Sequence, residues 1–581
     1  MGKKQGIVKV IFDYIVIGAG TAGGVIAKEL TDDKKTSLLV LDAGTNMTNE
    51  LISPSLETAT IFAAYNKFSY NILSQEEPAI GRQLRLTGGR VLGGSSQYNT
   101  MYAVRGSRDL YDAWAEIGGK QWRYDNIRSL FKKNEAYTGT TQSSIERGKK
   151  GPIFVRQQII PNNGLIQTLA EATSTILGIP IVEDYNTGVS DCTFFKSQFT
   201  QKEVDGMFVR SSTATGYLNS NILTHGNQLN PYEFGVGNRK LVIFAKTTVN
   251  KILFKERNGV QIVVGVEYVK DGVSQIVFAR KGIIVSAGNF SSVILQRSGI
   301  GKSTDLAEAG ITTLVESPNV GHNFQAHHFV GMGVEVETKR LQQVLDADPN
   351  QPITIGAFKK ETGAGRRLQL VGVPVPLFLP VQEVFINNWK FDPVKPSNIM
   401  SIAIIDLNPK SKGTITVAHS DPEAYPSVTF NPLENPDDLN FLVDHYIETF
   451  KIMMKARELD PGGIYKVVFP PENIFNLPNE VEKRNQLAAY AKAYYANFDH
   501  FGGQCKMGRN IEEGVVDGFL NVFGTKNLKV ADLSIAPILP DGNTSMPAQM
   551  IGLNAVKFIQ TNPHAFVVDD DEFEDYPTTN R

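Results

Sequence analysis

The chain is poor in cysteine and has no long apolar run. Only Cys192 and Cys505 occur among 581 residues, so at most one disulfide can form and a cysteine-based zinc site is not expected. No segment approaches the roughly 18 apolar residues of a membrane-spanning helix, and the N-terminus lacks a signal-peptide pattern. The formal net charge of −2 gives no basic field for nucleic acid. We therefore expect a cytoplasmic protein without a metal centre, a membrane segment or a nucleic-acid partner.

The first forty residues alternate between strand and helix patterns. Residues 11–17 form an apolar run, residues 21–30 have a helical pattern, and residues 37–41 form a second apolar run. A strand, a helix and a second strand in this order predict a βαβ unit, and hence a parallel sheet with helices on its faces.

Three glycines mark the first turn of that unit. Gly18 would permit a tight turn, Gly20 would let the backbone approach a pyrophosphate, and Gly23 would let the helix pack closely on the strand. Asp42 ends the second apolar run, where an acidic side chain can bind a ribose hydroxyl. The pattern predicts a dinucleotide site, but it does not distinguish FAD from NAD.

The rest of the chain predicts a second lobe. Strand-like runs occur at 241–245, 262–268 and 283–286, whereas 340–400 reads as irregular and rich in proline. Alternating patterns at 402–406, 414–418 and 427–430 predict an antiparallel sheet, and helical patterns follow at about 437–456 and 480–496. The acidic tail from residue 567 onward is expected to be mobile.

Three further segments contain many glycine or small hydroxyl residues, and the last of them begins with His500. They are residues 88–101, residues 286–301, and residues 500–508 with their continuation to 547. With the first glycine turn, and in this order, they resemble the glucose–methanol–choline (GMC) oxidoreductase family over residues 12–560. The resemblance implies an α/β protein with a Rossmann-like FAD-binding domain and a second α+β substrate lobe built on an antiparallel sheet. We assign 7–145, 218–325 and 505–562 to the FAD domain, 146–217 and 326–504 to the lobe, and 563–581 to the tail.

The resemblance also implies the residues that hold FAD. They are Gly18, Gly20, Thr21, Ala22, Gly23, Asp42, Ala43, Gly44, Arg90, Gly93, Gly94, Ser95, Asn99, Met101, Val249, Ala287, Asp532, Asn543, Ser545 and Met546. Tyr98 stands where relatives with a covalent flavin carry histidine, so we expect noncovalent FAD.

By the same resemblance, His500 and Asn543 are the catalytic residues. An alcohol loses hydride more readily as an alkoxide, so a base is wanted at its hydroxyl, and a neutral amide can orient that hydroxyl. We expect hydride transfer from a primary alcohol to flavin N5, with His500 as base and the N-terminus of a helix starting near Thr544 facing the ring. Asp499 could raise the pKa of His500 if it pointed inward. His327 and His328 are expected to be ordinary core or surface residues.

Two other functions remain open from the sequence. One is a structural or assembly subunit that keeps FAD with little turnover. The composition, rich in Asn, Ile and Lys, and the segment 524–537 also resemble the GMC-type proteins of mimivirus-like giant viruses, and this resemblance would place the protein in a virion. The other is a flavin-dependent lyase. The expected partners are a small-molecule alcohol and oxygen or another electron acceptor, and a homo-oligomer is one assembly that the sequence permits.

Overall fold

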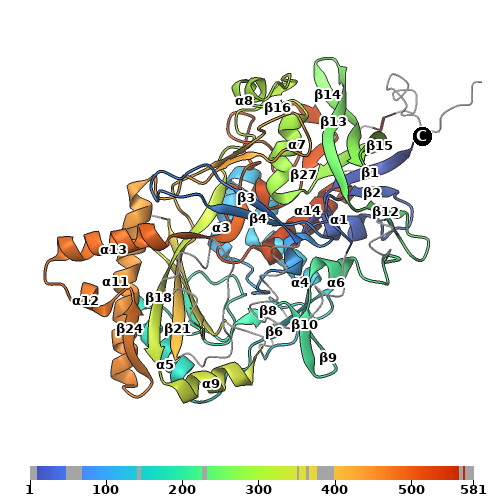
Figure 1. Ribbon diagram of the computed structural model, residues 1–581. Coiled ribbons are helices and arrows are strands. Elements are labelled where there is room, and N and C mark those ends of the chain that lie inside the picture. The colour runs from blue at the N-terminus through green and yellow to red at the C-terminus, as the bar shows by residue number, and fades with distance from the viewer. Residues whose placement is uncertain are drawn as a thin grey trace, which may run out of the picture.

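Two β-sheets organise the molecule. The computed structural model describes residues 10–46, 68–140, 145–225, 232–349, 353–361, 365–375, 398–561 and 567–568. Among these residues, one sheet contains nine strands and the other seven. In Figure 1 the nine-stranded sheet lies at the upper right and the seven-stranded sheet at the lower left.

The centre of the nine-stranded sheet is parallel. β12 (Leu241–Phe244), β2 (Leu38–Leu41), β1 (Ile11–Ile17) and β15 (Val273–Val285) are successive parallel neighbours, and β27 (Leu528–Val530) pairs in parallel with the end of β15. The strands β14 (Val260–Lys270) and β13 (Thr247–Arg257) continue it as antiparallel strands, with β11 (Tyr232–Phe234) at the far edge and β26 (Thr525–Lys526) beside β14. The predicted βαβ unit is confirmed, since α1 (Gly23–Leu30) joins β1 and β2.

The C-terminal helix completes this domain. α14 (Ser545–Thr561) packs so closely on α1 that a Cβ on Gly552 would lie 2.8 Å from the carbonyl oxygen of Ala22. The side chain of Gln549 accepts a hydrogen bond from Asn134 at 2.8 Å and donates one to Thr213 at 3.1 Å. The helix is therefore fixed on both sides by buried contacts.

The seven-stranded sheet is antiparallel, as predicted for the second lobe. Its order is β24 (Ile464–Phe469), β18 (Gln325–Val336), β21 (Ile399–Asp406), β20 (Arg367–Val373), β19 (Ile355–Lys360) and β7 (Cys192–Phe194), and β25 (Ala496–Gly502) also pairs with β18.

Side chains alternate between the two faces along β18, β20 and β21. In these strands, even-numbered residues such as Val330, Leu370 and Ile404 pack in one core with α5 (Leu165–Leu177) and α11 (Pro436–Leu459). Odd-numbered residues such as Phe329 and Val373 pack in a separate core on the opposite face. The helices therefore cover one face, and the other face is free to enclose a site.

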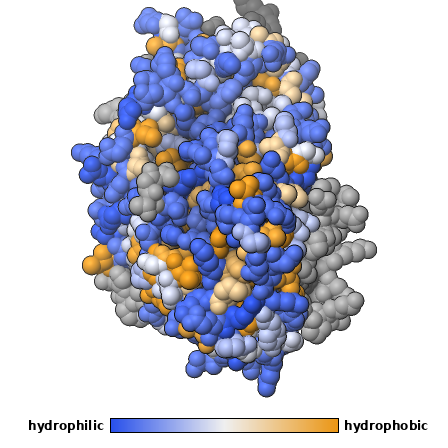
Figure 2. All heavy atoms as spheres, turned by 90° about the vertical axis from the view of Figure 1, so that its left-hand side faces the viewer, coloured by the Kyte–Doolittle hydropathy of each residue, from blue (hydrophilic) through white to orange (hydrophobic). Residues whose placement is uncertain are grey.

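The helical side of this lobe has a mostly polar surface. α11 and α13 (Glu480–Tyr494) lie at the left in Figure 1, and Figure 2 shows that hydrophilic residues predominate on this face, with hydrophobic ones in small groups. Both helices were predicted from the sequence. Asn435 accepts a hydrogen bond from the Asp437 amide at the start of α11, and Pro436 occupies its first turn, where no amide hydrogen is needed.

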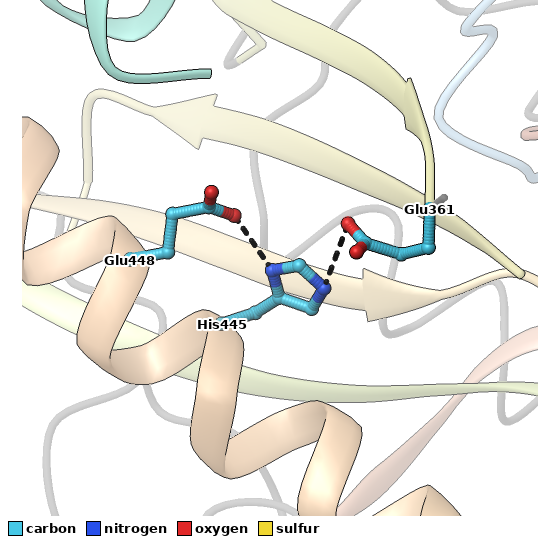
Figure 3. A group of neighbouring side chains, drawn as sticks. All are labelled: Glu361, His445 and Glu448. Atoms are coloured by element: carbon cyan, nitrogen blue, oxygen red, sulfur yellow. Dashed lines mark hydrogen bonds and ion pairs between the residues drawn. The ribbon is translucent and has the colours of Figure 1, made fainter. Parts of the chain in front are cut away.

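A charged cluster joins α11 to the end of β19 (Figure 3). His445 Nδ1 lies 2.9 Å from Glu448, and its Nε2 lies 3.4 Å from Glu361. These groups lie close enough to hold a metal ion. However, the Lys359 ammonium lies 2.9 Å from Glu448 and 3.7 Å from Glu361, so a cation of the chain itself already balances the carboxylates. We read the cluster as an ionic contact between two elements.

The structure corrects three expectations. β22 (Thr414–Thr416) and β23 (Ser427–Thr429) pair with each other in a separate two-stranded sheet instead of joining the large one. The segment 340–400, expected to be irregular, contains most of α9 (Thr338–Ala347) and the strands β19 and β20. Every residue of β20 is buried, the polar residues Arg367 and Gln369 included, so the strand has no exposed face.

Third, part of the acidic tail is packed. Val568 is buried beside Ile262 and Phe278, and its amide donates to the carbonyl oxygen of Arg280 at 2.8 Å. Val567 beside it is exposed, and the remaining tail residues lie outside the described part of the chain. Cys192 and Cys505 are both buried and unpaired. Within the described residues, no helix is long and apolar enough to cross a membrane.

Shorter elements connect these parts of the fold. They are β3 (Ser69–Leu73), β4 (Arg85–Gly89), η2 (Gly94–Gln97), α3 (Arg108–Gly118), η3 (Lys120–Trp122), α4 (Tyr124–Asn134), β5 (Glu135–Tyr137), β6 (Ile153–Gln157), β8 (Gln198–Phe199), β9 (Gln201–Val204), β10 (Met207–Arg210), α6 (Thr213–Tyr217), η4 (Gly288–Phe290), α7 (Ser291–Arg297), β16 (Ile300–Gly301), α8 (Ser303–Glu308), β17 (Val315–Glu316), α12 (Glu472–Phe475) and η5 (Leu533–Ile535).

Candidate active site

A long cavity of about 530 Å³ lies between the two sheets. It is lined by the β1–α1 turn, the end of β2, the segment 87–100, the turn after β15, the bulged strand β25 and the N-terminus of α14. Segments from both ends of the chain therefore form one wall, as the sequence predicted.

Two glycine segments meet at the cavity. Gly18 has a φ of 98°, and a Cβ there would lie 2.4 Å from the carbonyl oxygen of Ser286. A Cβ on Gly94 would lie 2.8 Å from the Cα of Gly20. Side chains at these positions would collide with the backbone of the neighbouring segment, so the glycines let these segments pack closely along the cavity wall.

Asp42 lines the cavity beside this turn. Its carboxylate accepts hydrogen bonds from the amides of Ala19 at 2.6 Å and Gly44 at 2.7 Å, and burial raises its pKa. The side chain therefore braces the glycine turn. Each carboxylate oxygen keeps a further lone pair for a ribose hydroxyl, the role predicted from the sequence.

A second buried carboxylate supports the opposite wall. Asp532 accepts from the Gly288 amide at 2.8 Å, the Ser291 hydroxyl at 2.6 Å and the Ser534 amide at 2.9 Å. It thus ties the turn after β15 to the segment after β27. Burial is the largest influence on its pKa and raises it.

Most of the sequence-predicted residues line the cavity. They are His500, Gly18, Gly20, Thr21, Ala22, Asp42, Ala43, Gly44, Arg90, Gly94, Ser95, Asn99, Val249, Ala287, Asp532, Asn543 and Ser545. Arg90 lies over the ring of Tyr70 and donates to the carbonyl oxygen of Ala43 at 3.3 Å.

Four predicted residues do not line the cavity. Gly23 faces the turn, since a Cβ there would lie 1.9 Å from the carbonyl oxygen of Gly18. Gly93 packs against Ala214, and the side chains of Met101 and Met546 are in the interior. These residues lie behind the cavity wall, and their role in holding FAD stays a prediction.

His500 lies at the end of the cavity that faces the seven-stranded sheet. Its Nδ1 is 2.9 Å from Nδ1 of His327, and the two rings meet edge to face with centroids 5.0 Å apart. Burial lowers the pKa of His500 to about 3 and that of His327 well below its usual value. Both imidazoles are therefore neutral at physiological pH, and Nε2 of His500 is the nitrogen left for the cavity.

Asn543 stands beside His500 at the same end. Gln369, which is fully buried on β20, places its Nε2 3.5 Å from Oδ1 of Asn543. A contact at this length is weak, but it favours an amide orientation in which the Asn543 NH₂ group is free to donate into the cavity. Thr544, Ser545 and Ala548 also line the cavity, so the start of α14 faces it as predicted.

Asp499 does not act on His500 as the sequence suggested. Its Oδ1 accepts from the Thr87 hydroxyl at 3.1 Å, and burial alone accounts for the lowered pKa of His500. The carboxylate is turned toward β4, so it cannot raise the basicity of its neighbour.

Sequence reasoning missed several residues of this end of the cavity. Phe329, Val373, Val375, Asn497 and Phe498 line it, and His327 contacts His500 directly. No spacing pattern could have found His327, since its partner is 173 positions away. Strand alternation provides the signal only once the sheet is known. Odd-numbered residues of β18 lie on the side of the sheet that holds the cavity, so His327 and Phe329 are on that side while His328 faces the helices.

Comparisons with known proteins agree with this arrangement. Family models described as GMC oxidoreductase match residues 12–329 and 409–552. The chain is 28% identical to an oxygen-dependent choline dehydrogenase of Rhizobium rhizogenes, covering 95% of this chain and 96% of that protein. It is 30% identical to oxygen-dependent choline dehydrogenase 1 of Chromohalobacter salexigens, covering 93% of each.

Solved structures share the fold. Pyridoxine 4-oxidase from Mesorbium loti has a TM-score of 0.78 at 22% identity, covering 95% of this chain and 99% of that one. A fungal aryl-alcohol oxidase has a TM-score of 0.73 at 19% identity, covering 96% of this chain and all of that one. The glycine turn, the braced acid after β2 and the long cavity suit an extended dinucleotide, and the cofactor is FAD. The chain belongs to the GMC oxidoreductase family.

Proposed function

We propose that the protein oxidises a primary alcohol, with noncovalent FAD as the hydride acceptor at N5 and His500 as the base. The observation that supports this proposal best is the position of His500: its imidazole lines the cavity, is neutral, and has only Nδ1 engaged by a neighbour. A neutral imidazole can take the hydroxyl proton as hydride leaves the carbon.

The surrounding residues suit this chemistry. The NH₂ group of Asn543 can donate to the substrate oxygen, and the N-terminus of α14 favours negative charge nearby. Phe329 and Phe498 give this end of the cavity an apolar lining. Bound FAD supplies the two-electron acceptor, and oxygen or another acceptor would reoxidise it. Tyr98 supports the noncovalent proposal, because it is buried with its hydroxyl 3.4 Å from Ser69 Oγ.

The test is anaerobic flavin reduction. Purified protein should show an oxidised-flavin spectrum that bleaches on addition of a primary alcohol, with benzyl alcohol and choline as two members of the panel. His500→Asn should slow bleaching by about 10²- to 10⁴-fold, the usual contribution of a general base. His225→Asn is the matched control, since His225 is exposed and its positive φ suits asparagine.

Other outcomes would contradict the proposal. A flavin that no alcohol bleaches, in a protein that forms large assemblies, would favour the structural subunit. Product without net flavin reduction would favour the lyase. A His500→Asn variant that bleaches at the wild-type rate would exclude His500 as the base.

A further inference from the structure

β25 bulges at the point where it passes His327. Ala326 pairs with Phe501, but His328 pairs with Asn497, so the single residue His327 lies opposite Phe498, Asp499 and His500. Such bulges turn a side chain out of the regular alternation of a strand. Here the bulge brings His500 beside the cavity-facing side of β18.

Only one proton can lie between the Nδ1 atoms of His327 and His500. Both rings are neutral, and the 2.9 Å separation of their Nδ1 atoms requires that one donate and the other accept. If His327 donated, Nε2 of His500 would carry a hydrogen and could not act as a base. If His500 donates, its Nε2 presents a lone pair to the cavity.

We propose that His327 is a positioning residue whose Nδ1 accepts the Nδ1–H of His500, fixing His500 in the tautomer with an unprotonated Nε2 at the cavity. This inference rests on the proposed function. The same acceptor serves after proton transfer, because the imidazolium of His500 still needs a partner for its buried Nδ1–H.

The charge then stays on His500. The titratable groups near His327 are His500 on β25, His328 on its own strand and the Lys412 ammonium, which donates to Gln325 Oε1 at 3.1 Å. Burial opposes a positive charge on His327 most, and His500, His328 and Lys412 add to this effect, so the proton is not passed on. His327 thus acts only as a neutral acceptor.

Three variants of the FAD-loaded protein test the proposal. His327→Leu removes the acceptor and should slow anaerobic flavin reduction by about 100-fold, within the range for a displaced general base, with little change in alcohol affinity. His327→Asn keeps an acceptor oxygen near the position of Nδ1, so its flavin should be reduced at least about tenfold faster than that of His327→Leu. His328→Asn, on the same strand but facing the helices, controls for the loss of a buried histidine. Its flavin should be reduced at nearly the wild-type rate.

A measurement independent of turnover reads the tautomer directly. In the FAD-loaded protein labelled with ¹⁵N-histidine, the signals lost in His500→Asn should show a protonated Nδ1 and an unprotonated Nε2. This readout decides the question even if His327→Leu fails to fold. A protonated Nε2, or an asparagine variant no faster than the leucine variant, would overturn the proposal.

The two proposals fail separately. If His500→Asn retains wild-type reduction, the proposed base is wrong. If His500→Asn loses reduction but His327→Leu keeps it, His500 remains the base and only the role of His327 is overturned.

Discussion

A missing side chain at position 23 lets α1 start where it does. The carbonyl oxygen of Gly18 lies where a Cβ would be, and this contact fixes the distance between the β1–α1 turn and the helix. Gly23 therefore acts on the ligand through the backbone of the turn rather than by direct contact.

We expect Gly23→Ala to destabilise the protein by about 1–3 kcal/mol, typical of overpacking, and to lower its flavin content. Thermal unfolding and the ratio of flavin to protein absorbance measure the two effects. Gly462→Ala is the matched control, because a Cβ there would meet nothing closer than 3.8 Å. Equal stability and flavin content in the two variants would contradict this role of Gly23.

The bulge in β25 sets the direction of His500. Asp499 adopts a φ of 49°, a left-handed conformation that aspartate and asparagine tolerate and β-branched residues resist. The hydrogen bond from Thr87 then anchors the bulge to β4.

Asp499→Val should displace His500 and lower the rate of flavin reduction about tenfold or more, given a backbone penalty of roughly 1–2 kcal/mol. Asp499→Asn, which keeps both the φ and an acceptor for Thr87, should remain close to wild type. Asp205→Val places the same residue at a φ of 51° in the exposed β9–β10 turn, so it should lose stability without losing reduction. Stopped-flow reduction and thermal unfolding distinguish these variants.

The elements also show which parts of the fold could be predicted. β1, α1 and β2 were predictable because an apolar run, a glycine turn and an amphipathic helix follow one another within forty residues. β20 was missed because both of its faces are buried and it lies in a segment that reads as irregular and rich in proline. The pairing of β22 with β23 depends on tertiary partners. His500 and Asn543 could be named from a family resemblance, whereas His327 depends on the register of β18 against β25.

At the scale of the whole molecule, three buried histidines make stability depend on pH. Burial lowers the pKa of His328 and His500 to about 3 and that of His327 well below its usual value. Each binds a proton in the unfolded chain below about pH 6.5 that the folded protein excludes. Their contribution to stability is full above that pH and is lost as the pH falls toward 3.

Unfolding free energy should therefore fall as the pH drops from 7 to 5, by up to about 1.4 kcal/mol per pH unit for each histidine. Asp406, whose pKa burial raises to about 6, opposes part of this effect. His500→Asn should reduce the slope by one histidine's share, as measured by denaturant unfolding at several pH values. An unchanged slope would show that His500 titrates normally.

The order in which the cavity is assembled follows from where its walls lie in the chain. β27 joins the parallel sheet from residues 528–530, and α14, which closes the cavity, spans residues 545–561. During synthesis on the ribosome these segments emerge long after β1 and its glycine turn. A nascent polypeptide therefore has no enclosed compartment for the flavin until α14 has been made, and cofactor loading must follow the synthesis of that helix.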